Sequence, residues 1–385
     1  MKPGNEILSG YGTTVFEVMS RLAMEHGTIN LGQGFPDENG PDDVRDVAAQ
    51  TLLEGPNQYP PMLGVPELRQ AVAAHNKRFY GVDVDWQTEV MVTSGATESL
   101  AACMFALLDK GDEVVLFEPL YDSYLPIVRR AGAVPKLVRL EPPDWRLPMD
   151  QLTAAFSERT KLVLLNNPMN PTGKVFTFDE LAAIAKLVEQ YDAYALCDEV
   201  YEHIYYEGAE FTSFMTVPGM RRRTLRIGSA GKTFSLTGWK VGYTTAPPDL
   251  LGLVAKAHQF LTFTTPPNLQ KAVAYGLGKD DAYFSGLASE MQGKRDLIRA
   301  GLKRVGFDVA VCDGTYFINA DFRPLGFDGD DVAFCRHITE HAGVTALPVS
   351  AFYQGGGVDH LARFCFSKQD AVLEEAVDRL AKYFG

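Results

Sequence analysis

The sequence predicts an α/β protein with a mostly parallel sheet between helices in a large domain and a smaller α+β domain. Short apolar runs alternate with helical stretches in the middle of the chain, which indicates parallel strands joined by crossover helices. After about residue 285 this alternation ends, and one long helix precedes three further strands. We predict a large domain over 43–286, and a small domain formed by 1–42 together with 287–385.

The N-terminal segment begins with an amphipathic helix over 13–25. A strand from Ile29 then runs into a Gly- and Pro-containing loop over 32–37. Loops of this kind lie at surfaces or clefts and often carry function. Helices are predicted over 41–54 and from Pro66, because a proline at the first helical position loses no hydrogen bond.

Five apolar runs are predicted as the strands of the large sheet: Glu89–Thr93, Glu113–Phe117, Leu162–Leu165, Tyr194–Cys197 and Thr224–Ile227. One helix between them is well marked, since Thr177 and Glu180 form a capping box and Phe176 and Leu181 fit a hydrophobic staple. A long helix over roughly 285–305 opens the last part of the chain. The strands predicted after it cover 307–311, 315–320 and 361–366.

Polar or aromatic residues follow every run of the large sheet. These segments are Ser94–Glu98, Glu118–Tyr121, Asn166–Gly173, Asp198–Tyr201 and Ser229–Lys232. Because ligands of open parallel sheets bind at the carboxyl ends of the strands, we expect one functional rim there.

Composition limits the partners and the compartment. The net charge of −13 argues against nucleic acid and anionic membrane as partners. No stretch is long and apolar enough to span a bilayer, and the first six residues lack the apolar region of a signal peptide. The five scattered cysteines suit buried thiols in a reducing cytoplasm.

Two short motifs resemble known ligand-binding patterns, but we interpret both matches as chance. Gly231-Lys232-Thr233 imitates the end of a nucleotide phosphate loop, but Arg226 stands where that motif needs a glycine. His337-Ile338-Thr339-Glu340-His341 matches an inverted zincin pattern. Its surroundings describe an ordinary amphipathic helix with no third ligand, so no metal site is predicted.

The side chains at this rim are complementary to the chemical groups of one cofactor. A helix that opens at Ser94–Thr97 can bind an anion through its free N–H groups, helped by Ser229 and Lys240. Asp198 can bind a cationic ring nitrogen, and Lys232 can form a Schiff base with an aldehyde.

Three further side chains suit the same ring. Tyr201 and Asn170 can hydrogen-bond a phenolic oxygen, and Tyr121 can stack on a flat ring. Each also has an ordinary role: Asp198 as a helix cap, the tyrosines as core residues, and Asn170 in a turn. Taken together, the groups predict pyridoxal 5′-phosphate as the cofactor.

Four motifs carry a family resemblance: Asn170-Pro171-Thr172-Gly173, Asp198-Glu199-Val200-Tyr201, Ser229-Ala230-Gly231-Lys232 and Arg363-Phe364-Cys365-Phe366. Over essentially its full length the chain resembles class I/II aminotransferases of pyridoxal phosphate fold type I. It looks most like the kynurenine aminotransferase, glutamine transaminase K and methionine aminotransferase branch. The segments Leu31–Asp37, Asn57–Tyr59 and Gly231–Gly242 carry that likeness, including Lys240 where many class members have arginine.

The resemblance implies a role for each site residue. Lys232 would bind the cofactor and shuttle the proton, and Asp198 would keep the ring nitrogen protonated. The phosphate would be held by Ala96, Thr97, Ser229 and Lys240, and the ring by Tyr121, Asn170 and Tyr201. Arg363 would grip the substrate α-carboxylate with a bidentate fork, helped by Asn170 and the backbone of Gly34. Tyr59 would reach the phosphate of a neighbouring subunit, which implies a homodimer.

The substrates implied are an amino acid and a 2-oxo acid. Five aromatic residues occupy segments that line the pocket in related enzymes: Phe16, Phe35, Tyr59, Phe260 and Phe263. They favour methionine, glutamine or aromatic amino acids over aspartate, although a role for the Arg221–Arg223 run stays open. N-succinyldiaminopimelate aminotransferase and cysteine-conjugate β-lyase are the alternative activities. A regulator without turnover is disfavoured because the chain has no room for a DNA-binding segment.

Overall fold

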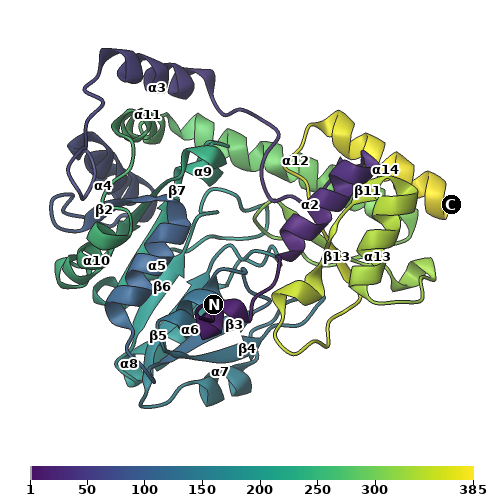
Figure 1. The fold of residues 1–385 in the computed structure, drawn as a ribbon, viewed down its shortest axis with the longest axis horizontal. Coiled ribbons are helices and arrows are strands. Elements are labelled where there is room, and N and C mark those ends of the chain that lie inside the picture. Colours follow the sequence, from purple (N-terminus) through teal and green to yellow (C-terminus); the bar gives the residue numbers. More distant parts are fainter. Residues whose placement is uncertain (1) are drawn as a thin grey trace.

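A seven-stranded sheet forms the centre of the computed structural model, which describes residues 2–385 (Figure 1). Met1, the start of the predicted N-terminal segment, lies outside the described residues. The strands are β2 (Val90–Ser94), β3 (Glu113–Glu118), β4 (Val134–Arg139), β5 (Thr160–Asn166), β6 (Tyr194–Asp198), β7 (Thr224–Ser229) and β8 (Val241–Thr245). Their order is β2-β8-β7-β6-β5-β3-β4, and β8 alone runs in the direction opposite to the other six strands.

All five strands predicted for this sheet are confirmed, but β4 and β8 were missed. β4 is an edge strand that contains Pro135 and Lys136, and proline is tolerated at such an edge. β8 contains Gly242 and two threonines, so it lacks the continuous apolar run that marks the other strands.

Helices cover both faces of the sheet, and successive residues of one strand serve opposite faces. In β5, Leu162 and Leu164 join the core under α5 (Gly95–Leu107), α6 (Tyr124–Arg130) and α10 (Pro248–Leu261). Val163 and Leu165 join the opposite core with α7 (Met149–Ala155) and α8 (Phe178–Gln190). This burial on both faces explains the continuous apolar runs of the sequence. The capping box of Thr177 and Glu180 is present at the start of α8.

Three helices pack together near the β2–β8 edge of the sheet. They are α3 (Asp42–Glu54), α4 (Pro66–Tyr80) and α11 (Pro267–Leu277). Two of them begin at a proline, as predicted for Pro66. The long helix α12 (Asp281–Val305) leads from this region to the C-terminal part (Figure 1).

A second, four-stranded sheet has the order β12-β13-β10-β9 and is antiparallel. Its strands are β9 (Asp308–Val309), β10 (Phe317–Asp321), β12 (Leu347–Pro348) and β13 (Leu361–Cys365). The helices α2 (Val15–His26), α13 (Asp331–His337) and α14 (Asp370–Phe384) lie beside it in Figure 1. The N-terminal segment joins this part because β1 (Ile29–Asn30) pairs with β11 (Val344–Thr345). The short helix α1 (Glu6–Ser9) lies on α6 instead.

The helix that carries the zincin-like pattern is less regular than predicted. α13 ends at His337, and a π-helical turn over Ile338–Ala342 follows it. Across residues 2–385, no helix combines the length and the apolar character needed to cross a membrane.

Candidate active site

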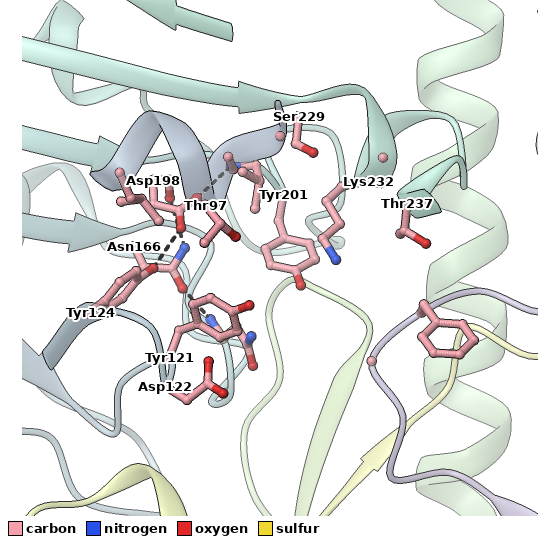
Figure 2. A pocket seen from close by; sticks show the side chains of 18 of the residues that line it. Thr97, Tyr121, Asp122, Tyr124, Asn166, Asp198, Tyr201, Ser229, Lys232 and Thr237 are labelled. Atoms are coloured by element: carbon pink, nitrogen blue, oxygen red, sulfur yellow. Dashed lines mark hydrogen bonds between the residues drawn. The ribbon is translucent and has the colours of Figure 1, made fainter. Parts of the chain in front are cut away.

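A cavity of about 430 Å³ opens at the carboxyl ends of the strands of the large sheet (Figure 2). The predicted cofactor and substrate residues that line it are Phe16, Gly34, Ala96, Thr97, Tyr121, Asn170, Asp198, Tyr201, Ser229, Lys232, Lys240 and Arg363. Of the predicted set, only Tyr59 lies elsewhere. The rim expected from the strand ends therefore exists, and residues of both sheets meet at it.

Lys232 lies in α9 (Ala230–Thr233), directly after β7, and points into this cavity (Figure 2). Its Nζ donates a hydrogen bond to the Tyr316 hydroxyl at 2.9 Å, and that hydroxyl donates to the Gly34 carbonyl at 3.0 Å. Burial lowers the pKa of Lys232 to about 8, against the smaller opposing effects of Cys365 and Asp198. The cavity thus holds an oriented amine that loses its proton more easily than an ordinary lysine.

Asp198 is the last residue of β6 and is buried. The Tyr124 hydroxyl donates to its Oδ2 at 2.7 Å, and the Asn166 amide donates to its backbone carbonyl at 2.9 Å. Burial raises the pKa of Asp198, and the Tyr124 hydrogen bond opposes this rise. A cationic ring nitrogen would compensate the buried carboxylate, so the position suits the pyridine of the predicted cofactor.

The start of α5 and Lys240, the residue directly before β8, border a space that suits an anion; this space is called the anion cradle. Gly95 has φ +74°, and a Cβ there would lie 3.3 Å from the Lys240 Nζ. A Cβ on Gly242 would lie 2.8 Å from the Ala96 nitrogen, so β8 approaches the first turn of α5 closely. The helix N-terminus, Lys240 and the nearby Ser229 and Thr97 hydroxyls therefore border one space, which fits a phosphate.

Arg363 is a fully buried guanidinium in β13. It donates to the Asn170 side-chain oxygen at 2.9 Å and to the Gly32 carbonyl at 3.1 Å, and it lies 4.0 Å over the Phe317 ring. Within residues 2–385 its Nε has no hydrogen-bond partner. Burial lowers the pKa of Arg363 to about 10. A buried cation with neutral partners is complementary to a carboxylate.

Three residues of the site were not singled out from the sequence: Tyr316, Tyr124 and Asn166. Tyr316 lies just before β10, and the sequence marked it only as part of a strand. Asn166 lay in the predicted rim segment but was assigned no role. Its side-chain oxygen accepts from the Asn170 nitrogen at 2.7 Å. The only sequence signal was the position of Asn166 and Tyr316 next to a strand end, and no such signal marked Tyr124, which opens α6.

The aromatic residues divide into two groups. Phe16 and Phe35 line the cavity. Tyr59 and Phe260 are each 84% exposed, and Tyr59 packs edge-to-face on Phe263 with ring centroids 5.6 Å apart. Tyr59, Phe260 and Phe263 therefore lie outside the cavity of their own chain.

The Arg221–Arg223 run, whose role in substrate binding was left open, does not line the cavity of its own chain. Arg221 pairs with Glu89 at 2.8 Å, and Arg223 pairs with Asp192 at 2.7 Å. The run precedes β7, whereas the cavity lies at the other end of that strand.

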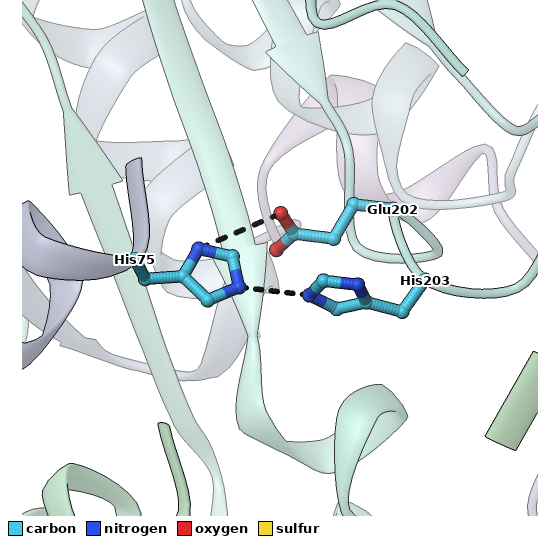
Figure 3. Close-up of side chains that lie close together, drawn as sticks. All are labelled: His75, Glu202 and His203. Atoms are coloured by element: carbon cyan, nitrogen blue, oxygen red, sulfur yellow. Dashed lines mark hydrogen bonds and ion pairs between the residues drawn. The ribbon is translucent and has the colours of Figure 1, made fainter. Parts of the chain in front are cut away.

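A buried cluster of His75, Glu202 and His203 has the composition of a metal site (Figure 3). The two Nε2 atoms are 2.8 Å apart and share a hydrogen bond, while the Glu202 carboxylate is engaged by Arg226 and Tyr80. Burial lowers the pKa of His75 to about 3 and that of His203 to about 4. The two imidazoles thus form a neutral, hydrogen-bonded pair beside an ion pair, and His75 Nδ1 has no hydrogen-bond partner among residues 2–385.

The zincin-like pattern is also engaged internally. His337 Nε2 lies 2.7 Å from the Tyr383 hydroxyl, and its ring packs on that of His341 with centroids 4.8 Å apart. The pattern therefore serves packing between α13 and α14.

Comparisons with known proteins agree with this geometry. The family model "Aminotransferase class I and II" matches residues 26–380. Methionine aminotransferase of Escherichia coli is 39% identical, with 96% of this chain and 95% of the relative covered. Kynurenine–oxoglutarate transaminase of Dictyostelium discoideum is 37% identical, covering 99% and 96%.

The structure of N-succinyldiaminopimelate aminotransferase from Mycobacterium tuberculosis superimposes with a TM-score of 0.96. The two chains share 43% identity, and the match covers 99% of this chain and 100% of that one. The predicted fold class and the predicted enzyme class are confirmed. The chain belongs to the class I and II aminotransferases.

Proposed function

We propose that this aminotransferase binds pyridoxal 5′-phosphate in the cavity and moves an amino group from an L-amino acid to a 2-oxo acid. The observation that carries the proposal is the shared cavity of Lys232, Asp198 and Arg363. It combines an amine of lowered pKa, a buried carboxylate and a buried guanidinium. When bound, the cofactor supplies an electron sink for negative charge at the substrate α-carbon.

The side chains of the cavity then have distinct tasks. Lys232 takes and returns the proton of the α-carbon, and Tyr316 orients its Nζ. Asp198, positioned by Tyr124, would keep the ring nitrogen of the cofactor protonated. Tyr201 and Asn170 would hydrogen-bond the ring oxygen, and Tyr121 would stack on the ring. Ala96, Thr97, Ser229 and Lys240, which all line the cavity, would hold the phosphate.

The substrate is held by Arg363, whose guanidinium binds the α-carboxylate with Asn170 and the Gly34 backbone nearby. Phe16 and Phe35 give the cavity an apolar side, which favours methionine, glutamine or aromatic donors. N-succinyldiaminopimelate is the second candidate. It is favoured by the 43% identity to the mycobacterial enzyme of that name.

We also propose a homodimer with shared sites and two domains, 43–286 and 1–42 with 287–385. Tyr59 and Phe263, which are exposed and pack on each other, support the dimer together with the exposed Phe260, because contiguous apolar groups on a surface mark interaction sites. The two sheets, and the pairing of β1 with β11, support the domains. Finding only monomers by sedimentation at micromolar concentration would refute the dimer.

All five cysteines are buried and free, which supports a cytoplasmic location.

A visible spectrum tests the function directly. Protein incubated with pyridoxal phosphate should become yellow, and L-methionine or L-glutamine without any 2-oxo acid should bleach the band. Release of pyruvate and ammonia from a cysteine conjugate, with the band unchanged, would instead indicate a lyase. No band at all would refute the assignment of Lys232.

The rate of band formation should depend on pH. Only the neutral amine attacks an aldehyde, and the pKa of Lys232 in the cofactor-free protein is lowered from 10.5 to about 8. The neutral fraction therefore rises roughly tenfold per pH unit below pH 8 and then levels off. Stopped-flow absorbance between pH 6 and 10 checks this. A rate that keeps rising to pH 10 would show an unshifted lysine.

A further inference from the structure

An ion pair lies behind the first turn of α5, the helix whose N-terminus borders the anion cradle. His258 of α10 places its Nδ1 2.8 Å from Glu98 Oε1. The other carboxylate oxygen, Oε2, accepts the Ser94 N–H at 2.9 Å. Glu98 does not line the cavity, whereas Ala96 and Thr97 of the same turn do. The pair can therefore influence the cradle through the backbone of this turn and through its charge.

Water screens the charges of this pair poorly. The side chain of His258 is 0% exposed and that of Glu98 is 10% exposed. Among residues 2–385, His258 is the only cationic side chain that forms an ion pair with Glu98. The Cys103 thiol, which also interacts with Glu98, stays neutral because burial raises its pKa. The net charge of the pair therefore depends on the protons that His258 and Glu98 hold.

The hydrogen bonds determine how many protons that is. His258 Nε2 lies 3.0 Å from the Met62 carbonyl oxygen, which can only accept, so Nε2 carries a hydrogen. The contact between Nδ1 and Oε1 needs a second hydrogen, because a bare Nδ1 and an ionised carboxylate are both acceptors. With that hydrogen on either atom, the charges of the pair sum to zero. The pKa of His258 agrees: burial lowers it, but the hydrogen bond and charge of Glu98 outweigh burial and raise it overall.

This neutrality matters because a phosphate would bind at the same helix N-terminus. The first N–H groups of a helix have no intrahelical partner and carry partial positive charge, which attracts an anion. An uncompensated Glu98 carboxylate would lie in the same field and repel a phosphate. The imidazole of His258 cancels that repulsion, while Glu98 still holds the Ser94 N–H.

We propose that His258 is a positioning residue, which neutralises Glu98 and so keeps the anion cradle attractive to the cofactor phosphate. The inference rests on the proposed function, since it takes the cradle to hold that phosphate. It gives a role in cofactor binding to α10, although none of the residues 248–261 lines the cavity.

Pyridoxal, which has the aldehyde but lacks the phosphate, separates this effect from general damage to the site. We expect His258→Gln to raise the Kd for pyridoxal phosphate about tenfold and to leave the Kd for pyridoxal unchanged. Absorbance titration of the cofactor-free protein measures both. His26→Gln changes an exposed histidine at the end of α2 and should alter neither value. Equal losses with both ligands, or no loss with either, would overturn the proposal.

A double variant tests the charge itself. Glu98→Gln keeps a donor and an acceptor at this position but has no charge to neutralise, so it should bind pyridoxal phosphate as tightly as the parent. Adding Glu98→Gln to His258→Gln should restore the affinity to within about twofold, whereas two structural defects would accumulate. A double variant as weak as His258→Gln would refute the proposal. If His258→Gln does not fold, Glu98→Gln decides, because weaker binding there would show that the carboxylate charge is needed.

Inorganic phosphate tests the pair without the cofactor. Calorimetry with phosphate on the cofactor-free protein should show the same tenfold loss in His258→Gln and the same recovery in the double variant. If the parent protein forms no visible band but this pattern appears, the proposed function falls and the role of His258 stands. If the band forms and the pattern is absent, only the role of His258 falls. Absence of both would overturn both.

Discussion

Replacement of Lys232 by alanine should lower kcat by on the order of 10⁴-fold or more, since covalent attachment and proton transfer are lost together. Nothing else in the cavity can replace the amine: Lys240 borders the anion cradle, and Arg363 keeps its proton. The fold should survive, because the only hydrogen bond of Nζ is to Tyr316 within the described residues. Steady-state kinetics with L-methionine and a 2-oxo acid measures the loss.

Two variants give this experiment its controls. Lys186→Ala removes an exposed lysine from α8, far from the cavity, and should leave kcat unchanged. Tyr316→Phe removes only the hydroxyl that orients Nζ. Because this hydrogen bond contributes about 1 kcal/mol, kcat should fall roughly fivefold. A Lys232→Ala protein with more than a few per cent of the parent rate would contradict the mechanism.

Replacement of Arg363 by glutamine should lower kcat/KM by on the order of 10²- to 4 × 10³-fold while the cofactor band still forms. Removal of one partner from a buried charge pair costs about 3–5 kcal/mol, and here the pair is completed by the substrate carboxylate. Lys232 does not contact Arg363 by any hydrogen bond, so its own chemistry should persist. Band formation and kcat/KM, measured on the same preparation, separate the two effects.

The thermal stability of Arg363→Gln gives a second test of the role of Arg363. The lowered pKa of Arg363 shows that the folded protein disfavours its charge, so Arg363→Gln should not lower Tm appreciably. Arg363→Lys keeps a charge but loses the planar fork, and should fall between the parent and the glutamine variant in kcat/KM. An unchanged kcat/KM in Arg363→Gln would place the substrate carboxylate elsewhere.

Much of the site could be predicted because its main residues lie in short contiguous motifs. The residues that follow each strand are carried to one sheet edge by the parallel topology, so Asp198, Asn170 and Lys232 could be placed together before any contact was known. The anion cradle was predicted for the same reason, since a helix that starts at a strand end presents its N–H groups there.

The partners of these residues could not be predicted in this way. Tyr316 meets Lys232 across 84 residues of chain, and Tyr124 meets Asp198 across 74. The Arg221–Arg223 run shows the same limit, because its role stayed open until the fold placed it before β7, at the end of that strand away from the cavity.

The sequence by itself determined five of the seven strands of the large sheet, the family motifs and the chemical groups available for catalysis. The tertiary structure decided the state of those groups: the lowered pKa of Lys232 and the buried guanidinium of Arg363, which reaches the Gly32 carbonyl 331 residues away. Local patterns specify backbone geometry, whereas burial and charge depend on which distant segments the two sheets bring into contact.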